Sequence, residues 1–133
     1  MELSIDERLA AGVSAMANYS WQARPRPSGF DASELNVPPA SRVNIGLTGT
    51  HSRYFGQVSA SYVGRAFWQD VLDAPYHGWS PAYHVLDAGI GVRSTDGVTV
   101  AFRGTNLLNA SVQQHVFGDV IKRTFTGEVR FMF

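Results

Sequence analysis

The chain has 133 residues, about the length of one domain, and its 11 basic and 11 acidic side chains give a net charge of zero with neutral histidines. This balance excludes the basic surface of a nucleic-acid-binding protein, and the lack of cysteine excludes disulfides and thiolate metal sites. No run reaches the roughly 18–20 apolar residues of a transmembrane helix, and the opening MELSIDERLAAG lacks the basic region and apolar core of a signal peptide.

From the start of the chain, apolar residues fall on every second position, which is the period of a β-strand. MELSID predicts a first strand over 1–6. VSAMANYSWQA predicts a second strand over 13–23, in which only Met16 breaks the alternation, and RVNIGLTGT predicts a third over 41–50. Each of these stretches is expected to form a strand with one apolar face.

The same alternation continues to the last residue and predicts four more strands, over 55–68, 83–94, 98–108 and 121–133. The final stretch, TFTGEVRFMF, is unusual because it ends on an aromatic residue, whereas chain termini are usually polar and frayed. One face of this strand carries its large apolar residues: Phe125, Val129, Phe131 and Phe133.

The connections between the seven strands alternate between short and long. The short ones are ERLAAG, HSRY and TDG, and the long ones are RPRPSGFDASELNVPPA, QDVLDAPYHGWSPA and roughly NASVQQHVFGDV. In an up-and-down sheet this alternation places tight turns at one end and long loops at the other, as in outer-membrane barrels. We therefore expect an all-β fold, an antiparallel up-and-down transmembrane β-barrel segment of about seven strands. It would be an incomplete barrel, because bacterial single-chain barrels close with an even number of strands.

The two predicted faces differ in composition. The apolar face carries small residues that fill a protein core poorly but suit a lipid-facing wall: Ala15, Ala17, Gly46, Ala60, Ala88 and Gly104. Aromatic residues near the long-loop ends are expected to form an interfacial girdle: Tyr19, Trp21, Tyr62, Trp68, Trp79 and Tyr83. Charged residues of the polar face are expected to face the barrel lumen: Arg65, Asp87, Arg93, Arg103, Glu128 and Arg130.

Four stretches resemble the final strands of TonB-dependent outer-membrane receptors, in the same order along the chain. They are NVPPASRVNIGL, YVGRAFW, YHVLDAGIGV and the C-terminal GTNLLN with QQHVFGDVIKRTFTGEVRFMF. The likeness extends from about Leu3 to Phe133. It implies that the whole chain, 1–133, is the C-terminal part of such a barrel, whose full form has about 22 strands around a plug. The plug domain and the N-terminal strands are absent from this chain.

This resemblance implies a role in nutrient uptake through the outer membrane of a Gram-negative bacterium, with a ferric siderophore or cobalamin as typical cargo. The segment would form the C-terminal barrel wall and the closing strand, in contact with outer-membrane lipid, the remainder of the barrel and the plug. The TonB complex would act through that plug. The β-barrel assembly machinery would recognise the terminal pattern of Phe125, Val129, Phe131 and Phe133.

No catalytic constellation, metal motif or nucleotide-binding loop is apparent in the sequence. We therefore expect no enzymatic activity, no metal, no cofactor and no nucleic-acid partner. Loops held on a rigid barrel commonly carry binding sites. The candidate ligand-binding residues lie in or beside the long connections: Asp70, Asp73, His77, Trp79 and His115. The lumen-facing charges could also contact an anionic substrate, or pair with one another.

Two other interpretations stay open. A soluble β-barrel or sandwich that binds a small apolar ligand would need one set of residues inside, whereas the receptor segment needs the same set outside: Val43, Ile45, Leu47, Val100 and Phe102. A small complete outer-membrane barrel of about eight strands would need a further strand and an export signal upstream.

Overall fold

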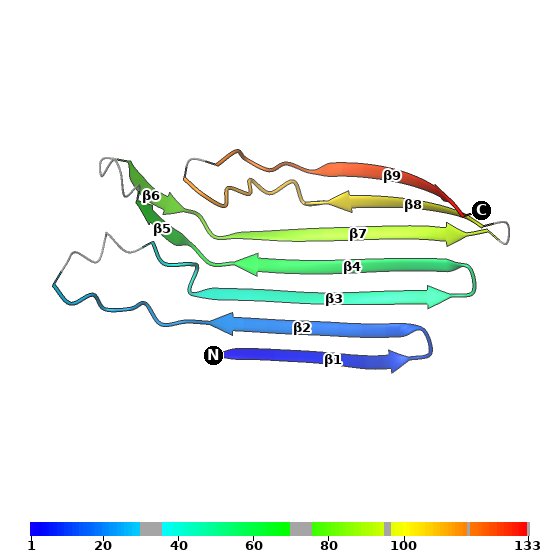
Figure 1. The fold of residues 1–133 in the computed structure, drawn as a ribbon, viewed down its shortest axis with the longest axis horizontal. Coiled ribbons are helices and arrows are strands. Elements are labelled where there is room, and N and C mark those ends of the chain that lie inside the picture. The colour runs from blue at the N-terminus through cyan, green and yellow to red at the C-terminus, as the bar shows by residue number, and fades with distance from the viewer. Residues whose placement is uncertain (30–35, 70–75, 95–96, 117, 133) are drawn as a thin grey trace.

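The computed structural model describes residues 1–29, 36–69, 76–94, 97–116 and 118–132, and every regular element in these ranges is a β-strand. Seven strands form one antiparallel sheet in the order β1-β2-β3-β4-β7-β8-β9, and two form a separate hairpin (Figure 1). The strands are β1 (Glu2–Ala10), β2 (Val13–Trp21), β3 (Ser41–His51), β4 (Tyr54–Val63), β5 (Ala66–Gln69), β6 (His77–Ser80), β7 (Tyr83–Arg93), β8 (Val98–Thr105) and β9 (Thr124–Phe131). Within these ranges no helix is long and apolar enough to cross a membrane.

The sheet follows the chain up and down and stays open, because β1 and β9 each have a single neighbour. The N-terminus lies at the end of the long connections, and the C-terminus lies at the end of the short turns (Figure 1). We call these the loop end and the turn end. Gly12 and Gly97, both with φ of +75°, make two of the short turns, and a Cβ on Gly12 would overlap the Thr50 carbonyl oxygen. The all-β, incomplete up-and-down architecture predicted from the sequence is confirmed.

Several strand limits differ from the prediction, and β2 ends at Trp21 rather than at residue 23. The predicted strand 55–68 is two strands, because the chain leaves the sheet at Gly64, whose N–H donates to the Ser41 carbonyl over 2.9 Å. The following residues form the β5–β6 hairpin, which the sequence pattern did not predict. The first strand is longer than expected and reaches Ala10 through a bulge after Arg8. The last two strands are shorter, since β8 ends at Thr105 and β9 begins at Thr124.

The register places apolar side chains in rows across one surface of the sheet, which we call the apolar face. One row contains Ile5, Ala17, Ile45, Ala60 and Leu86. The next contains Ala15, Leu47, Val58, Ala88, Gly104 and Phe125. The opposite surface, the polar face, carries rows such as Ser14, Thr48, Gln57, Gly89, Arg103 and Thr126.

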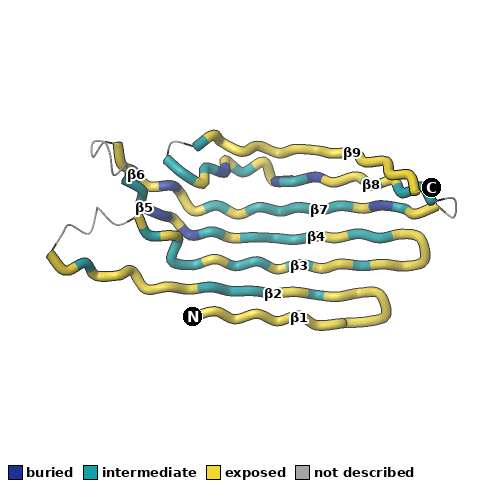
Figure 2. The backbone as a smooth tube through the Cα atoms, in the orientation of Figure 1, coloured by how far each residue is buried: buried dark blue, intermediate teal, exposed yellow. Residues whose placement is uncertain are grey.

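Nearly all residues of the seven-stranded sheet are exposed or half-buried (Figure 2), and several large side chains of the apolar face are exposed. Ile45 is 50% exposed, Phe102 53% and Ile90 64%. Among the described residues only Ala66 and Val112 are buried apolar side chains, and both lie in the loop-end segments. No apolar core therefore lies on either face of the sheet within the described part of the chain.

Gly46 lies on the polar face, which corrects the prediction for this residue. In the register it stands between Met16 and Ser59, and a Cβ at Gly46 would lie only 3.2 Å from Met16 Cγ. The missing side chain thus makes room for Met16, the one apolar residue that broke the alternation of the second strand. A large residue on the polar face is accommodated by a glycine on the neighbouring strand.

Candidate ligand-binding site

The polar face ends at a pocket under the β5–β6 hairpin, at the loop end. This polar-face pocket has a volume of about 530 Å³ and is lined by Pro39, Arg42, Asn44, Val63, Trp68, Ser80, Tyr83, Gln114 and His115. Strands β3, β4 and β7 supply its floor, the hairpin supplies one wall, and the connection between β8 and β9 supplies another. The volume lies within the range of about 300–1,000 Å³ typical of small-molecule pockets.

The β5–β6 hairpin has two different surfaces, because side chains alternate along its strands. Trp68 and Ser80 face the polar-face pocket, and the Trp68 ring packs against His115 with 4.7 Å between ring centroids. Gly78 stands opposite Trp68 in the hairpin register, and a Cβ there would come within 3.3 Å of Val116. The small residue lets the β8–β9 connection approach the hairpin.

Asn106 organises the β8–β9 connection at its start. It is buried, and its side-chain amide donates to the carbonyls of Ala110 over 2.8 Å and Ile121 over 3.2 Å. Its side-chain oxygen accepts from the Ala110 N–H over 2.9 Å, and its own N–H donates to Asp87 Oδ1 over 2.8 Å. These bonds tie both ends of the connection to β7, which fixes the segment that carries His115.

The polar-face pocket offers aromatic faces together with hydrogen-bond donors. Trp68 and Tyr83 provide ring surface, and Arg42 provides a guanidinium with five N–H groups. The Trp68 indole N–H is buried and has no acceptor within the described part of the chain. Asn44, at the floor, donates to the Asn18 side chain over 2.8 Å. The arrangement suits a ligand with planar groups and several acceptor oxygens.

The predicted ligand-binding residues are divided by the structure. His115 lines the polar-face pocket. His77 and Trp79 lie on the other surface of the hairpin, where both pack near Phe67 with ring centroids 5.9 and 5.4 Å away. Asp70 and Asp73 lie outside the described residues. The prediction missed Arg42. In the sequence it is an ordinary polar residue of a strand, and only the position of the hairpin makes it part of a pocket.

The predicted aromatic girdle is also divided. Tyr19, Trp21 and Tyr62 lie on the apolar face at the loop end, as expected from their strand positions. Trp68 and Tyr83 line the polar-face pocket instead, because Trp68 belongs to the hairpin and Tyr83 pairs with the polar-face residue Val63. Trp68 and Tyr83 therefore do not belong to the predicted girdle, because β4 ends at Val63.

The charged residues expected to face a lumen lie mostly on the polar face, away from the polar-face pocket: Asp87, Arg93, Arg103, Glu128 and Arg130. Arg130 pairs with Glu128 over 2.8 Å, and Arg93 lies over the Phe55 ring at 4.5 Å. The Arg103 guanidinium faces the Gln57 side-chain amide, and turning this amide over places its oxygen to accept from Arg103. Arg65 differs, since it lies in the link after β4 and stacks on Trp79.

The terminal pattern lies on the apolar face. Phe125, Val129 and Phe131 are all exposed, and Phe125 stacks on Phe102 of β8 at 5.7 Å between ring centroids. Phe133 lies outside the described residues. This surface is continuous with the apolar face of the rest of the sheet.

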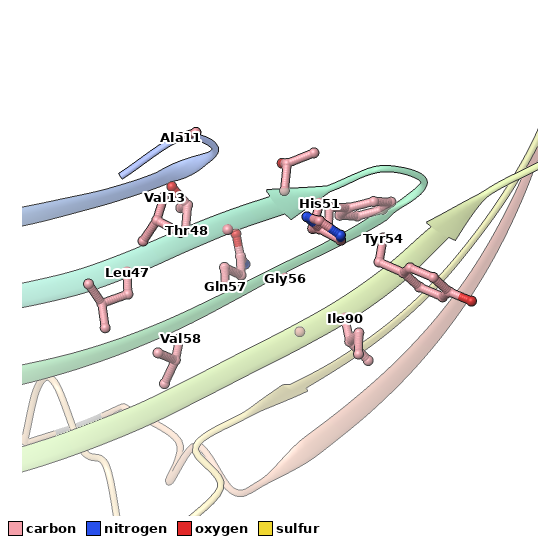
Figure 3. A pocket seen from close by; sticks show the side chains of 14 residues that line it. Ala11, Val13, Leu47, Thr48, His51, Tyr54, Gly56, Gln57, Val58 and Ile90 are labelled. Atoms are coloured by element: carbon pink, nitrogen blue, oxygen red, sulfur yellow. The ribbon is translucent and has the colours of Figure 1, made fainter. Parts of the chain in front are cut away.

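A second hollow, of about 560 Å³, lies at the turn end (Figure 3). Gly49 and Gly56 face each other in the register between Val13 and Ile90, so this row has no side chains at its centre. Figure 3 shows Leu47, Val58 and Ile90 standing beside the gap. The hollow is a shallow depression in the apolar face.

Within the described residues no three histidine, aspartate or glutamate side chains gather as a metal site. Comparisons with models of protein families, with curated proteins and with solved structures found no significant match for this chain. The two faces of the sheet and its loop end are the features of this chain that bear on its function.

Proposed function

We propose that this chain forms the C-terminal wall and closing strand of a TonB-dependent outer-membrane receptor. The observation that carries this proposal is the apolar face, which no described segment covers. It is apolar across the seven strands apart from Glu7 in β1, and the polar face carries the other charges of the sheet. A soluble protein rarely exposes a continuous apolar surface of this extent, because it would associate in water. Against lipid the same surface is stable. Its alanine and glycine residues are tolerated there, because lipid chains do not need large side chains to fill the space beside them.

The two open edges support the same proposal. The outer rims of β1 and β9 have no partner within the described residues, so their N–H and C=O groups lack a ladder neighbour. Unpaired backbone groups cannot remain in the apolar part of a bilayer. The remaining strands of a barrel would pair with both rims and close the wall. The plug, the TonB complex and the assembly machinery enter this proposal from the sequence resemblance alone.

The polar-face pocket fits a role in nutrient binding. It lies at the loop end, and it combines Arg42, Trp68 and Tyr83 in one cavity. In the receptor this pocket would face the extracellular end of the lumen. A ferric siderophore, cobalamin or similar cargo offers the planar groups and acceptor oxygens that such a pocket holds. Transport itself would also need the plug.

The soluble-barrel alternative requires the apolar face to point inward. Val43 is half-buried, but Ile45, Leu47, Val100 and Phe102 are exposed, and no described segment covers them. Their exposure favours the receptor segment.

Cysteine labelling tests the orientation of the sheet directly, because the chain has no native cysteine. Ala60 and Ser61 are adjacent, small and similarly half-buried, but they lie on the apolar and polar faces respectively. We expect Ala60→Cys in phosphatidylcholine vesicles to resist a charged maleimide, and a fluorophore placed there to be quenched by spin-labelled lipid. Ser61→Cys should react readily and escape that quenching. Equal reactivity and equal quenching at the two positions would contradict the proposal.

A further inference from the structure

We propose that Arg24, Arg65 and Trp79 form a binding site for a phosphate monoester, on the surface of the β5–β6 hairpin that faces away from the polar-face pocket. Arg24 follows β2, Arg65 follows β4, and Trp79 lies in β6, so three segments distant in sequence meet there. The site lies in the connections beyond the sheet. The proposed phosphate site therefore does not depend on whether the apolar face contacts lipid.

Two guanidinium groups share one indole ring. The Cζ atom of Arg24 lies 4.8 Å from the Trp79 ring centroid, and that of Arg65 lies 4.7 Å from it. Stacking uses the flat face of a guanidinium and leaves the N–H groups at its edge available. Neither arginine makes an ion pair or hydrogen bond with another described residue. Two positive charges thus lie against one ring, and their N–H donors have no partner among the described residues.

A small hollow lies beside the two arginines. It has a volume of about 90 Å³, and its walls include Pro25, Pro38 and Phe67 as well as Arg24 and Arg65. Proline restricts the backbone on one side, and the apolar walls keep water from surrounding a bound group completely, which strengthens charge-assisted hydrogen bonds. The volume is far below the roughly 300 Å³ of small-molecule pockets. It fits one charged group rather than a whole nutrient.

The charge and the donor geometry favour phosphate over carboxylate. A phosphate monoester carries about −1.5 to −2 charges near neutral pH and offers three acceptor oxygens. Two guanidinium groups match that charge, and each can donate two parallel N–H bonds to such an anion. A carboxylate would neutralise one arginine and leave the other unpaired. The phosphate could belong to a soluble molecule or to a lipid headgroup at the rim of the sheet.

The test uses the full chain folded in a non-ionic detergent and titrated with inorganic phosphate in a calorimeter. We expect saturable binding to the unchanged chain, about tenfold weaker binding for Arg24→Gln or Arg65→Gln, and none for the double variant. Arg53→Gln is the matched control, since Arg53 also stacks on an aromatic ring, that of Tyr54 at 5.2 Å, but lies at the turn end. Its phosphate affinity should stay within about twofold of the unchanged chain.

Vesicles identify the source of the phosphate group. If the site takes a lipid headgroup, phosphatidylcholine vesicles with phosphatidic acid should bind the chain more tightly than phosphatidylcholine alone, and only through Arg24 and Arg65. If it takes a soluble phosphate, the two vesicles should bind equally while inorganic phosphate still binds. Absence of saturable phosphate binding to the unchanged chain would overturn the proposal, and so would equal weakening by Arg53→Gln. The first result is phosphate binding to the unchanged chain. The proposal can therefore be contradicted even if a variant fails to fold.

Discussion

At the residue scale, the polar face depends on close pairs of a large and a small residue. Phe55 stands opposite Gly91 in the register, and a Cβ on Gly91 would overlap the Phe55 ring. The Arg93 guanidinium lies over the outer side of the same ring, at 4.5 Å. The absence of a side chain at Gly91 therefore makes room for the Phe55 ring, and that ring packs against Arg93.

Gly91→Ala should destabilise the folded chain by about 1–3 kcal/mol, because the added methyl group displaces the Phe55 ring. Gly127→Ala is the control, since no atom of the structure lies within 4 Å of a Cβ at that position and the strand gains β-propensity equally. Urea unfolding in detergent, followed by tryptophan fluorescence, measures both. Equal stability of the two variants would mean that Phe55 does not rest on Gly91.

Asn106 and Asn109 permit a second comparison. Both have positive φ, 51° and 53°, so replacement by alanine strains the backbone similarly. Asn106 loses three buried side-chain hydrogen bonds, whereas exposed Asn109 loses one, to the Arg123 N–H over 3.1 Å. Asn106→Ala should therefore be about 2 kcal/mol less stable than Asn109→Ala in the same urea assay. It should also weaken the His115–Trp68 contact, and so change the fluorescence of Trp68 in the folded state.

Alternation in the sequence assigned most residues of the sheet to the correct face. It succeeded for Ile45, Val58 and Phe102, because strand geometry forces side chains to alternate and these residues are clearly apolar. It failed for Gly46, since glycine has no side chain to identify a face. The charge balance likewise gave no sign of the Arg24–Trp79–Arg65 stack, because net charge does not report a local pair.

At the scale of the element, each central strand has one apolar and one polar surface. In β3, Leu47 and Thr48 are adjacent and both exposed, but on opposite faces. Leu47→Lys should cost about 1–3 kcal/mol in lipid vesicles, because a charge on the lipid face must leave water. Thr48→Lys should cost much less, since its neighbours Ser14 and Gln57 are polar. Urea titrations in vesicles measure the two values, and a reversed order would place the polar face against lipid.

The β5–β6 hairpin shows the limit of sequence patterns at this scale. Its strands have only four residues each, too short for a period to be recognised, and YVGRAFW continues the alternation of the preceding strand. The break is set by Gly64, which bonds back to Ser41 and turns the chain out of the sheet. Trp68 consequently faces the polar-face pocket, whereas an uninterrupted β4 would have placed it on the apolar face of the sheet.

At the scale of the whole molecule, the order of the strands followed from the lengths of their connections. Short and long connections alternate, and an up-and-down sheet is the simplest arrangement that satisfies them (Figure 1). The polar-face pocket could not be derived in the same way. It forms where residues from the segment before β3, from the hairpin and from the β8–β9 connection converge, and their meeting depends on side-chain contacts such as Trp68 with His115.

The open sheet as a whole predicts how the chain behaves in solution. One face is apolar over seven strands apart from Glu7, and the rims of β1 and β9 are unpaired within the described residues. Each feature favours association in water, the face through the hydrophobic effect and the rims through strand pairing. Sedimentation velocity should therefore find aggregates of the full chain in water and a single small species in detergent, which covers the face. A monodisperse monomer in water with an intact β-sheet spectrum would require a buried apolar face, and would therefore contradict both the exposed surface and the proposed receptor segment.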